Sequence, residues 1–437
     1  MKKLTIATVA SFLNFCQSNF GICSWFSGRD GGLKKKSQTN KSLLFLLLNT
    51  VWLSLGSFVA TEEMFSFSSL QSIVSALGLR IKLMSDSSMQ AVLRAMRLSF
   101  LRKHQMYVLQ TLKEKFALES SILAGKIVGI IDGTHVFNSL YACTCIIRGV
   151  ANFLVDFEPY TKGKELVAAN KLLRRILSKK YPLGIDVFIA DALYLTSDIV
   201  QELHRNAKDF VIKISESKEG SGKLKRAYRV ILRLASEAVR NFRRNSQGKI
   251  SFVTKGITVR KGTVRDKMRR RRYTVYTIWG LKFAQIDVYV QYVVPHFRYW
   301  GKTQKYRTEN FFIVTSIQNP AEAVLLATER WQIEETFDVM KNEFNIKNDF
   351  IYKGDVEAFR RLFTIVMIAM NLIAYYAACK ERQEGKRVNI RKLIRTLLDG
   401  FVQYFAVMLY NTAGQDERRR IEYFIAQINT ALIKLFG

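Results

Sequence analysis

Short apolar runs and amphipathic stretches alternate between residues 126 and 214. Three runs of β-forming residues come first, KIVGIID, YACTCII and ANFLVDF. A stretch with the apolar spacing of a helix, a strand-like run, a second helical stretch and a last run follow: KELVAANKLLRRILSKKY, DVFIAD, LTSDIVQELHRNA and DFVIKI. Strands that alternate with helices form a sheet covered by those helices, so this order predicts an α/β core with a mixed sheet.

The segments on either side of this core follow other patterns. Residues 41 to about 118 predict several helices, one of which opens at SDSSMQAVLRAM, where Ser or Asp can cap the first turn. Such compact helices with basic outer faces fit a helix-turn-helix DNA-binding module and a plain helical bundle equally well. After residue 214, SESKEGSGK breaks the alternation, and runs such as RRYTVYTIWG and AQIDVYVQYVV predict an inserted, mostly antiparallel subdomain.

These changes of pattern divide the chain into five segments. In order they are a helical DNA-binding domain, the first part of the α/β core, the β-rich insertion, the second part of the core with an amphipathic helix, and a helical C-terminal region that can serve dimerisation. The predicted boundaries are 1–118, 119–214, 215–318, 319–380 and 381–437. At 437 residues the chain is long enough for two to four domains.

Three apolar stretches raise the question of a membrane. The start, MKKLTIATVASFLNFC, resembles a secretory signal, but no convincing small-residue cleavage site follows it, so a plain N-terminal helix is favoured. The runs 43–60 and 363–379 are almost long enough to span a bilayer. Each carries an Asn near its middle, and this favours buried helices of a soluble protein over a membrane protein.

The charge of the chain points to a polyanionic partner. Lys and Arg number 68 against 36 Asp and Glu, which gives a formal charge of +32. A surplus of this size is most simply explained by nucleic acid, with an anionic membrane surface as the second explanation. The five cysteines form no CxxC pair and lie near no histidine cluster, so neither a zinc site nor a disulfide framework is expected, and a reducing cytosol fits.

Two aspartates stand at the ends of apolar strands, Asp132 in KIVGIIDGTH and Asp191 in DVFIADALY. A carboxylate at the C-terminal edge of a buried strand is unfavourable unless it is paired or bound to a cation, and open α/β sheets place their sites at this edge. Taken alone, each aspartate is better explained as a cap of the following segment. Together, on strands that can be neighbours, they favour a metal site.

A third carboxylate lies in an amphipathic helix, TERWQIEETFDVMKNEF, residues 328–344. At ~100° per residue, Arg330, Glu334 and Lys341 fall on one face, whereas Glu335 points away. An ordinary Arg-to-Glu pair four residues apart would explain Arg330 and Glu334. It does not explain Lys341, which is too far along the helix to serve Glu334.

These motifs resemble the signature of DDE transposases of bacterial insertion sequences, specifically the insertion-sequence-four group. The spacing Arg-x3-Glu-x6-Lys, IDGT at 131–134 and IADALY at 189–194 occur in that family's order, with a β-rich insert before the third motif. The resemblance covers residues 41 to 380. It departs from the family at Ala327, where a Tyr is usual, and this places the contact made by that Tyr in doubt.

The resemblance implies a ribonuclease-H-like catalytic domain in which Asp132, Asp191 and Glu334 bind two Mg²⁺ ions, with Mn²⁺ as a substitute. Two divalent ions ~3.5–4 Å apart stabilise the attacking and leaving oxygens of a phosphodiester, and Mg²⁺ prefers carboxylate oxygens. Arg330 and Lys341 would hold phosphates near the carboxylates. Further DNA contacts are expected from a basic run and two tryptophans: Arg269, Arg270, Arg271 and Arg272 for phosphates, and Trp279 and Trp300 for bases. For the tryptophans, a place in the core of the insertion is the favoured alternative.

The sequence therefore predicts a bacterial, cytoplasmic, nucleoid-associated DNA transposase. It would bind the terminal inverted repeats and target DNA as duplexes, cut and join them in an Mg²⁺-dependent reaction, and act as a homodimer without a membrane. Two alternatives stay open: a ribonuclease-H-like nuclease that hydrolyses without joining, and a catalytically silent DNA-binding protein derived from a transposase.

Overall fold

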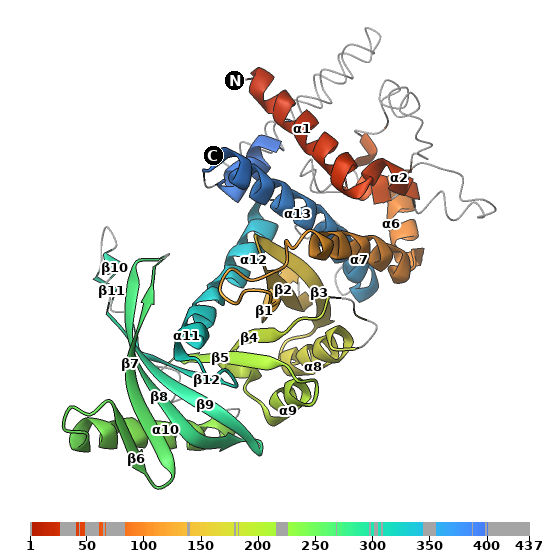
Figure 1. Cartoon of the computed structure of the whole chain (residues 1–437). Coiled ribbons are helices and arrows are strands. Elements are labelled where there is room, and N and C mark those ends of the chain that lie inside the picture. The colour runs from red at the N-terminus through yellow and green to blue at the C-terminus, as the bar shows by residue number, and fades with distance from the viewer. Residues whose placement is uncertain are drawn as a thin grey trace.

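The chain folds around one large mixed sheet (Figure 1). The computed structural model describes residues 2–26, 41–42, 44–48, 61–63, 66, 84–397 and 400, with breaks at 138–139, 179–180, 182, 216–225, 268, 297–298, 301–304, 307–308, 344–354 and 387. Most of the run 43–60 and of the C-terminal segment 381–437 therefore lie outside the described residues. The predicted α/β class with a mixed sheet is confirmed.

The sheet has ten strands, and its middle is parallel. From edge to edge the strands are β3 (Asn152–Tyr160), β2 (Leu140–Arg148), β1 (Val128–Phe137), β4 (Val187–Asp191), β5 (Asp209–Ser215), β12 (Phe311–Thr315), β9 (Ile286–Pro295), β8 (Arg271–Phe283), β7 (Ile257–Asp266) and β6 (Ser251–Thr254). Strands β1, β4 and β5 run parallel, and the other neighbours are antiparallel. A separate pair, β10 (Tyr299–Trp300) and β11 (Lys305–Tyr306), completes the strands of the described residues.

Helices cover both faces of the parallel part. Helix α8 (Glu165–Ile176) packs on β2 and β3, and α9 (Ser197–Arg205) packs on β5. On the other side, α11 (Pro320–Glu329) and α12 (Trp331–Glu343) follow each other across the sheet towards α13 (Val356–Glu384) (Figure 1). Alternation along β1 separates the two faces: a Cβ added to Gly133 would meet Glu165 of α8, whereas Asp132 contacts Arg330 at the start of α12.

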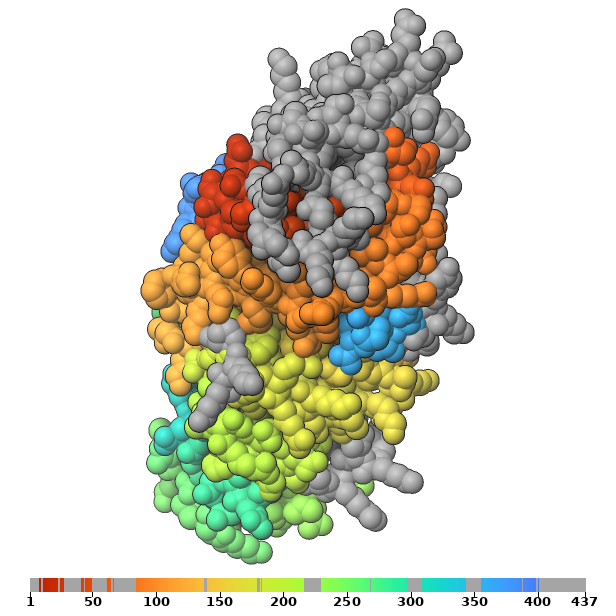
Figure 2. Space-filling model, turned by 90° about the vertical axis from the view of Figure 1, so that its right-hand side faces the viewer, coloured from red at the N-terminus to blue at the C-terminus, as the bar shows by residue number. Residues whose placement is uncertain are grey.

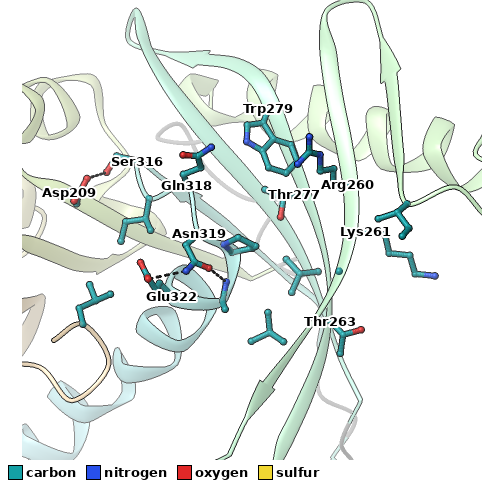
Figure 3. A pocket seen from close by; sticks show the side chains of 18 of the residues that line it. Asp209, Arg260, Lys261, Thr263, Thr277, Trp279, Ser316, Gln318, Asn319 and Glu322 are labelled. Atoms are coloured by element: carbon teal, nitrogen blue, oxygen red, sulfur yellow. Dashed lines mark hydrogen bonds between the residues drawn. The ribbon is translucent and has the colours of Figure 1, made fainter.

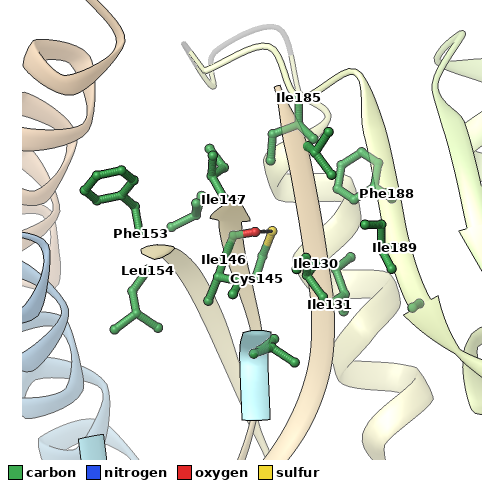
Figure 4. Close-up of a cluster of buried hydrophobic side chains, with 14 of the residues drawn as sticks. Ile130, Ile131, Cys145, Ile146, Ile147, Phe153, Leu154, Ile185, Phe188 and Ile189 are labelled. Atoms are coloured by element: carbon green, nitrogen blue, oxygen red, sulfur yellow. Dashed lines mark hydrogen bonds between the residues drawn. The ribbon is translucent and has the colours of Figure 1, made fainter. Parts of the chain in front are cut away.

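Branched aliphatic and aromatic side chains fill the space between the layers. Ile130 and Ile131 of β1, Ile146 of β2 and Ile189 of β4 are at most 2% exposed (Figure 4). Because parallel strands are covered on both faces, they are apolar almost throughout rather than alternating. A carboxylate among such apolar strands is unfavourable unless it is paired or bound to a cation.

A helical layer packs beside β3. It contains α1 (Lys2–Phe20), α2 (Ile22–Phe26), α6 (Asp86–Ala95) and α7 (Leu98–Glu114), and α13 lies against α7 and β3. Residues of α6 and α7 form a continuous band on the face shown in Figure 2. The rings of Phe12 and Tyr376 pack edge to face at 5.4 Å, so α1 is a helix seated on α13.

Helix α13 is the one helix of the described part that is long and apolar enough to cross a membrane. In its most apolar window, 83% of the residues are buried inside the protein. Its Asn371 bonds to the backbone of β3. These contacts are those of a core helix.

The insertion differs from the expectation in two ways. It contains a 20-residue helix, α10 (Arg226–Asn245), which the sequence analysis missed. The apolar positions of α10, among them Ile231, Ala235 and Phe242, recur at helical spacing and pack on β6 to β9. The strands of the insertion also continue the central sheet, because β12 pairs with both β5 and β9.

Candidate active site

The register of the parallel strands brings Asp132 and Asp191 side by side. Ile130 of β1 pairs with Ile189 of β4, and two residues further along the two strands lie Asp132 and Asp191. Side chains at matched positions of neighbouring strands point to the same face. Both carboxylates therefore lie on the face covered by α12. Asp191 ends β4, but β1 continues to Phe137, so the predicted strand end at Asp132 is wrong: Asp132 lies in the middle of β1, just past its pairing with β4.

Arg330 joins Asp132 to the glutamate of α12. Its Nη1 donates a hydrogen bond to Asp132 Oδ2 at 2.8 Å, and its Nη2 donates to Glu334 Oε1. Arg330 lies between α11 and α12, so the fork of one guanidinium connects β1 with α12. The structure thus brings Asp132, Asp191 and Glu334 together from three elements that are far apart in sequence.

Lys341 belongs to the same face of α12, as its spacing predicted. Its Nζ donates to Thr134 Oγ1 at 2.7 Å, two residues beyond Asp132 on β1. Burial lowers the pKa of the Lys341 ammonium, and Asp338 acts in the opposite direction. Lys341 therefore holds the far end of α12 on β1.

Lys213 is a third cation near the carboxylates, and the sequence analysis did not single it out. It is the register partner of Asp191 on β5, and its Nζ lies 4.5 Å from the centre of the Phe311 ring. Burial lowers its pKa, the charge of Arg330 lowers it further, and Glu334 raises it. The available signal was a lysine inside the apolar strand DFVIKI.

Glu165 is a fourth carboxylate close to Asp132, on the opposite face of β1. Tyr194 donates to its Oε1 at 2.7 Å and Tyr160 to its Oε2 at 3.0 Å. A Cβ on Gly133 would lie 2.3 Å from Glu165 Oε1, so a larger residue after Asp132 would require the side chains of Glu165 and Tyr160 to shift. The sequence alone showed Glu165 merely as an acidic residue at a helix start.

The environment of Asp132 shifts its protonation. Burial raises the pKa of its carboxyl to about 7, and Asp191 and Glu165 act in the same direction. The guanidinium of Arg330 and the N–H of Gly133 lower the pKa but do not cancel the burial. Clustered carboxylates and burial are the arrangement in which a bound cation is most strongly favoured.

This shift predicts a pH dependence of stability. Because the folded-state pKa of Asp132 is above its ordinary value of 3.8, the folded protein binds the proton more tightly than the unfolded chain. The contribution of Asp132 to the free energy of unfolding is therefore largest below pH ~4. This contribution falls by up to about 4 kcal/mol as the pH rises towards 7. Urea unfolding without divalent metal should show this fall in the parent and a flatter profile in Asp132→Asn. Parallel profiles of the two proteins would contradict it.

The basic run of the insertion divides into two kinds of arginine. The donors of the Arg269 guanidinium are used within the protein, because they bond to Asp266, Thr328 and Glu329. Arg271 interacts with the hydroxyl of Tyr273. Arg270 and Arg272 are exposed, and they are the members of the run that are accessible to a phosphate.

Trp279 is not brought to the carboxylates. It lines a pocket of about 770 Å³ between β7, β8 and the start of α11 (Figure 3). Its ring packs against Tyr289, and the guanidinium of Arg260 lies 5.3 Å from its centre. Lys126, which precedes β1, lines the same pocket, and six residues of extended chain, roughly 20 Å, separate it from Asp132. Trp300 lies in β10, which pairs with β11.

The donor set suits a hard divalent cation. Three carboxylates from β1, β4 and α12 offer the oxygen ligands that Mg²⁺ prefers. Within the described residues, however, no group of three or more His, Cys, Asp or Glu side chains is already arranged to hold a metal ion. In this structure Arg330 pairs with Asp132 and Glu334 as their counter-cation.

A family model described as "Transposase DDE domain" matches residues 145–372. The matched region contains Asp191 and Glu334, whereas Asp132 precedes it by 13 residues. No curated protein matches the chain.

Proposed function

The chain belongs to the family of transposase DDE domains, and from this premise we propose that it is a DNA transposase of the insertion-sequence-four type that cleaves transposon ends and joins them to target DNA. One observation carries the proposal: a single guanidinium, that of Arg330, holds Asp132 and Glu334 together beside Asp191. The family as a whole cuts and transfers nucleic acid, and the charge of +32 fits a DNA partner.

Asp132, Asp191 and Glu334 would hold the catalytic Mg²⁺, or Mn²⁺ in its place. When bound, two such ions supply charge stabilisation for the attacking and leaving oxygens of the phosphodiester. Asp132 and Glu334 would serve as ligands of these ions, and the guanidinium of Arg330, which bonds to both carboxylates here, would be the group that meets the phosphate. The planar fork of this guanidinium lies close to the carboxylates and can bind a phosphate through two hydrogen bonds.

Two further cations would help to place the DNA. Lys213 sits beside Asp191, and burial makes its charge effective over a longer distance than that of a solvated lysine. Lys341 lies beside Thr134 and is half-buried. Arg270 and Arg272 extend the cationic surface to the insertion. Binding of terminal inverted repeats by the N-terminal helices and pairing of two ends by a homodimer in the nucleoid complete the proposal.

Joining distinguishes this proposal from a nuclease of the same fold. We expect the protein to connect pre-cut DNA ends, taken from the inverted repeats that flank its coding sequence, to a supercoiled plasmid in the presence of Mg²⁺. A transposase gives joined products that migrate more slowly than the plasmid, whereas a nuclease gives only nicked plasmid. EDTA should abolish the products. Tight DNA binding without nicking or joining would instead identify a catalytically silent protein derived from a transposase. The departure from the family pattern at Ala327 is the reason to test this alternative.

A further inference from the structure

Glu329 is a buried carboxylate held between two arginines. It is the last residue of α11, directly before Arg330, and is 6% exposed. Arg269 Nη2 donates to its Oε1 at 2.7 Å, and Arg148 Nε donates to its Oε2 at 2.9 Å. Charge-assisted bonds of this kind in a buried position hold their partners firmly.

The first arginine ties the insertion to Glu329. Arg269 lies in the turn between β7 and β8, and its backbone N–H and guanidinium both bond to Asp266 at the end of β7. Asp266 is itself buried. Arg269 Nη1 also donates to Thr328 Oγ1 at 2.9 Å, so the turn is fixed to the last two residues of α11.

The second arginine continues the network to α12. Arg148 ends β2 and donates through Nη1 to Asn152 Oδ1 at the start of β3. The Asn152 amide then donates to the carbonyl of Gln332 and to Thr336 Oγ1, at 3.2 and 3.1 Å. Gln332 and Thr336 stand two residues before and two residues after Glu334. A continuous chain of polar contacts thus runs from the insertion to the helix that carries the third carboxylate.

We propose that Glu329 is a positioning residue that couples the β7–β8 turn of the insertion to α12 and so sets the placement of Arg330 and Glu334. This inference rests on the proposed function for its catalytic consequence. It assigns Arg269 to the coupling rather than to DNA phosphate. The insertion is then part of the catalytic apparatus, because a disturbance of its turn reaches Glu334 through Glu329.

Glu329→Gln and Arg269→Met test the coupling, with two matched controls. Arg270→Met removes an exposed arginine of the same turn, and Glu357→Gln removes an exposed carboxylate that pairs with Arg360 and Arg361. Three quantities are measured: the single-turnover rate of strand cleavage at saturating DNA, the affinity for a duplex at several salt concentrations, and amide hydrogen exchange of residues 331–343.

Coupling predicts a specific pattern. Both test variants should cleave about 10- to 100-fold more slowly at saturating DNA, because small misplacements of reacting groups have effects of this size, and the double variant should be no slower than the slower single variant. Their DNA affinity should stay within about twofold of the parent. Exchange in α12 should rise in both. Glu357→Gln should change none of these, and Arg270→Met should weaken only DNA binding.

Two results would overturn the coupling. If Arg269→Met lowers DNA affinity and its salt dependence while α12 exchange stays unchanged, Arg269 is a phosphate ligand. If Glu329→Gln leaves exchange in α12 unchanged, Glu329 does not position the helix. Amide hydrogen exchange can be measured on an inactive protein. A parent that fails to cleave DNA would therefore refute the proposed function, and the exchange of α12 would still decide whether Glu329 couples the turn to the helix. If Glu329→Gln does not fold, Arg269→Met decides alone.

Discussion

Asp132→Asn and Glu334→Gln are each expected to lower strand cleavage by at least about 10³-fold while duplex binding is retained. Each substitution keeps the shape of the side chain and removes one negative charge from the cluster that Arg330 holds together. Because all three carboxylates would act on the same ions, loss of one should remove nearly the whole rate enhancement. The measurement is Mg²⁺-dependent nicking of an end-bearing plasmid, with binding followed separately by fluorescence anisotropy.

Two carboxylates outside the cluster provide the controls. Asp338 lies one turn after Glu334 on α12 and pairs with Arg391, and Asp209 opens β5 at the opposite edge of the sheet. Asp338→Asn and Asp209→Asn should cleave within a few-fold of the parent. Parental cleavage by Asp132→Asn or Glu334→Gln would show that the cluster is not the catalytic centre.

The proximity of the two aspartates and the orientation of Glu334 were predictable because each follows a local rule. Asp132 and Asp191 end apolar runs on neighbouring parallel strands, although β1 continues past Asp132 to Phe137. Glu334 shares a helical face with Arg330 and Lys341 through simple periodicity. The sequence could not show that Arg330 bonds to Asp132 as well as to Glu334, because that contact joins residues 198 positions apart.

Other features depend on the fold as a whole. Arg269 was expected to bind phosphate as part of a basic run, but its neighbours in space are Asp266 and Glu329. Only Arg269 and Arg271 of that run are partly buried, and nothing in four consecutive arginines separates them from Arg270 and Arg272. Helix α10 was missed for a different reason: its apolar positions recur at helical spacing, but the basic residues between them were interpreted as turns between strands.

The role of Asn371 in the apolar helix α13 became apparent only from the structure. β3 is the edge strand of the sheet, so the backbone groups on its outer side lack a partner strand. Asn371 supplies the substitute: its Nδ2 donates to the carbonyl of Leu154, and its Oδ1 accepts from the N–H of Leu154, both at 2.8 Å. Its side-chain amide thus pairs with the strand as a neighbouring peptide would.

Asn371→Ala should therefore lower the free energy of unfolding by about 3–5 kcal/mol, since it leaves a buried N–H and a buried C=O unpaired at about 1–3 kcal/mol each and opens a small cavity. Urea unfolding at fixed pH measures the change as a lower midpoint. Thr364→Val is the matched control, because Thr364 is equally buried on α13 and its hydroxyl bonds, within the described part of the chain, to Arg360 of its own helix. That control should lose no more than about 1.5 kcal/mol. Equal losses in the two variants would show that α13 is held on β3 by apolar packing alone, and that the paired amide contributes nothing specific to the edge of the catalytic sheet.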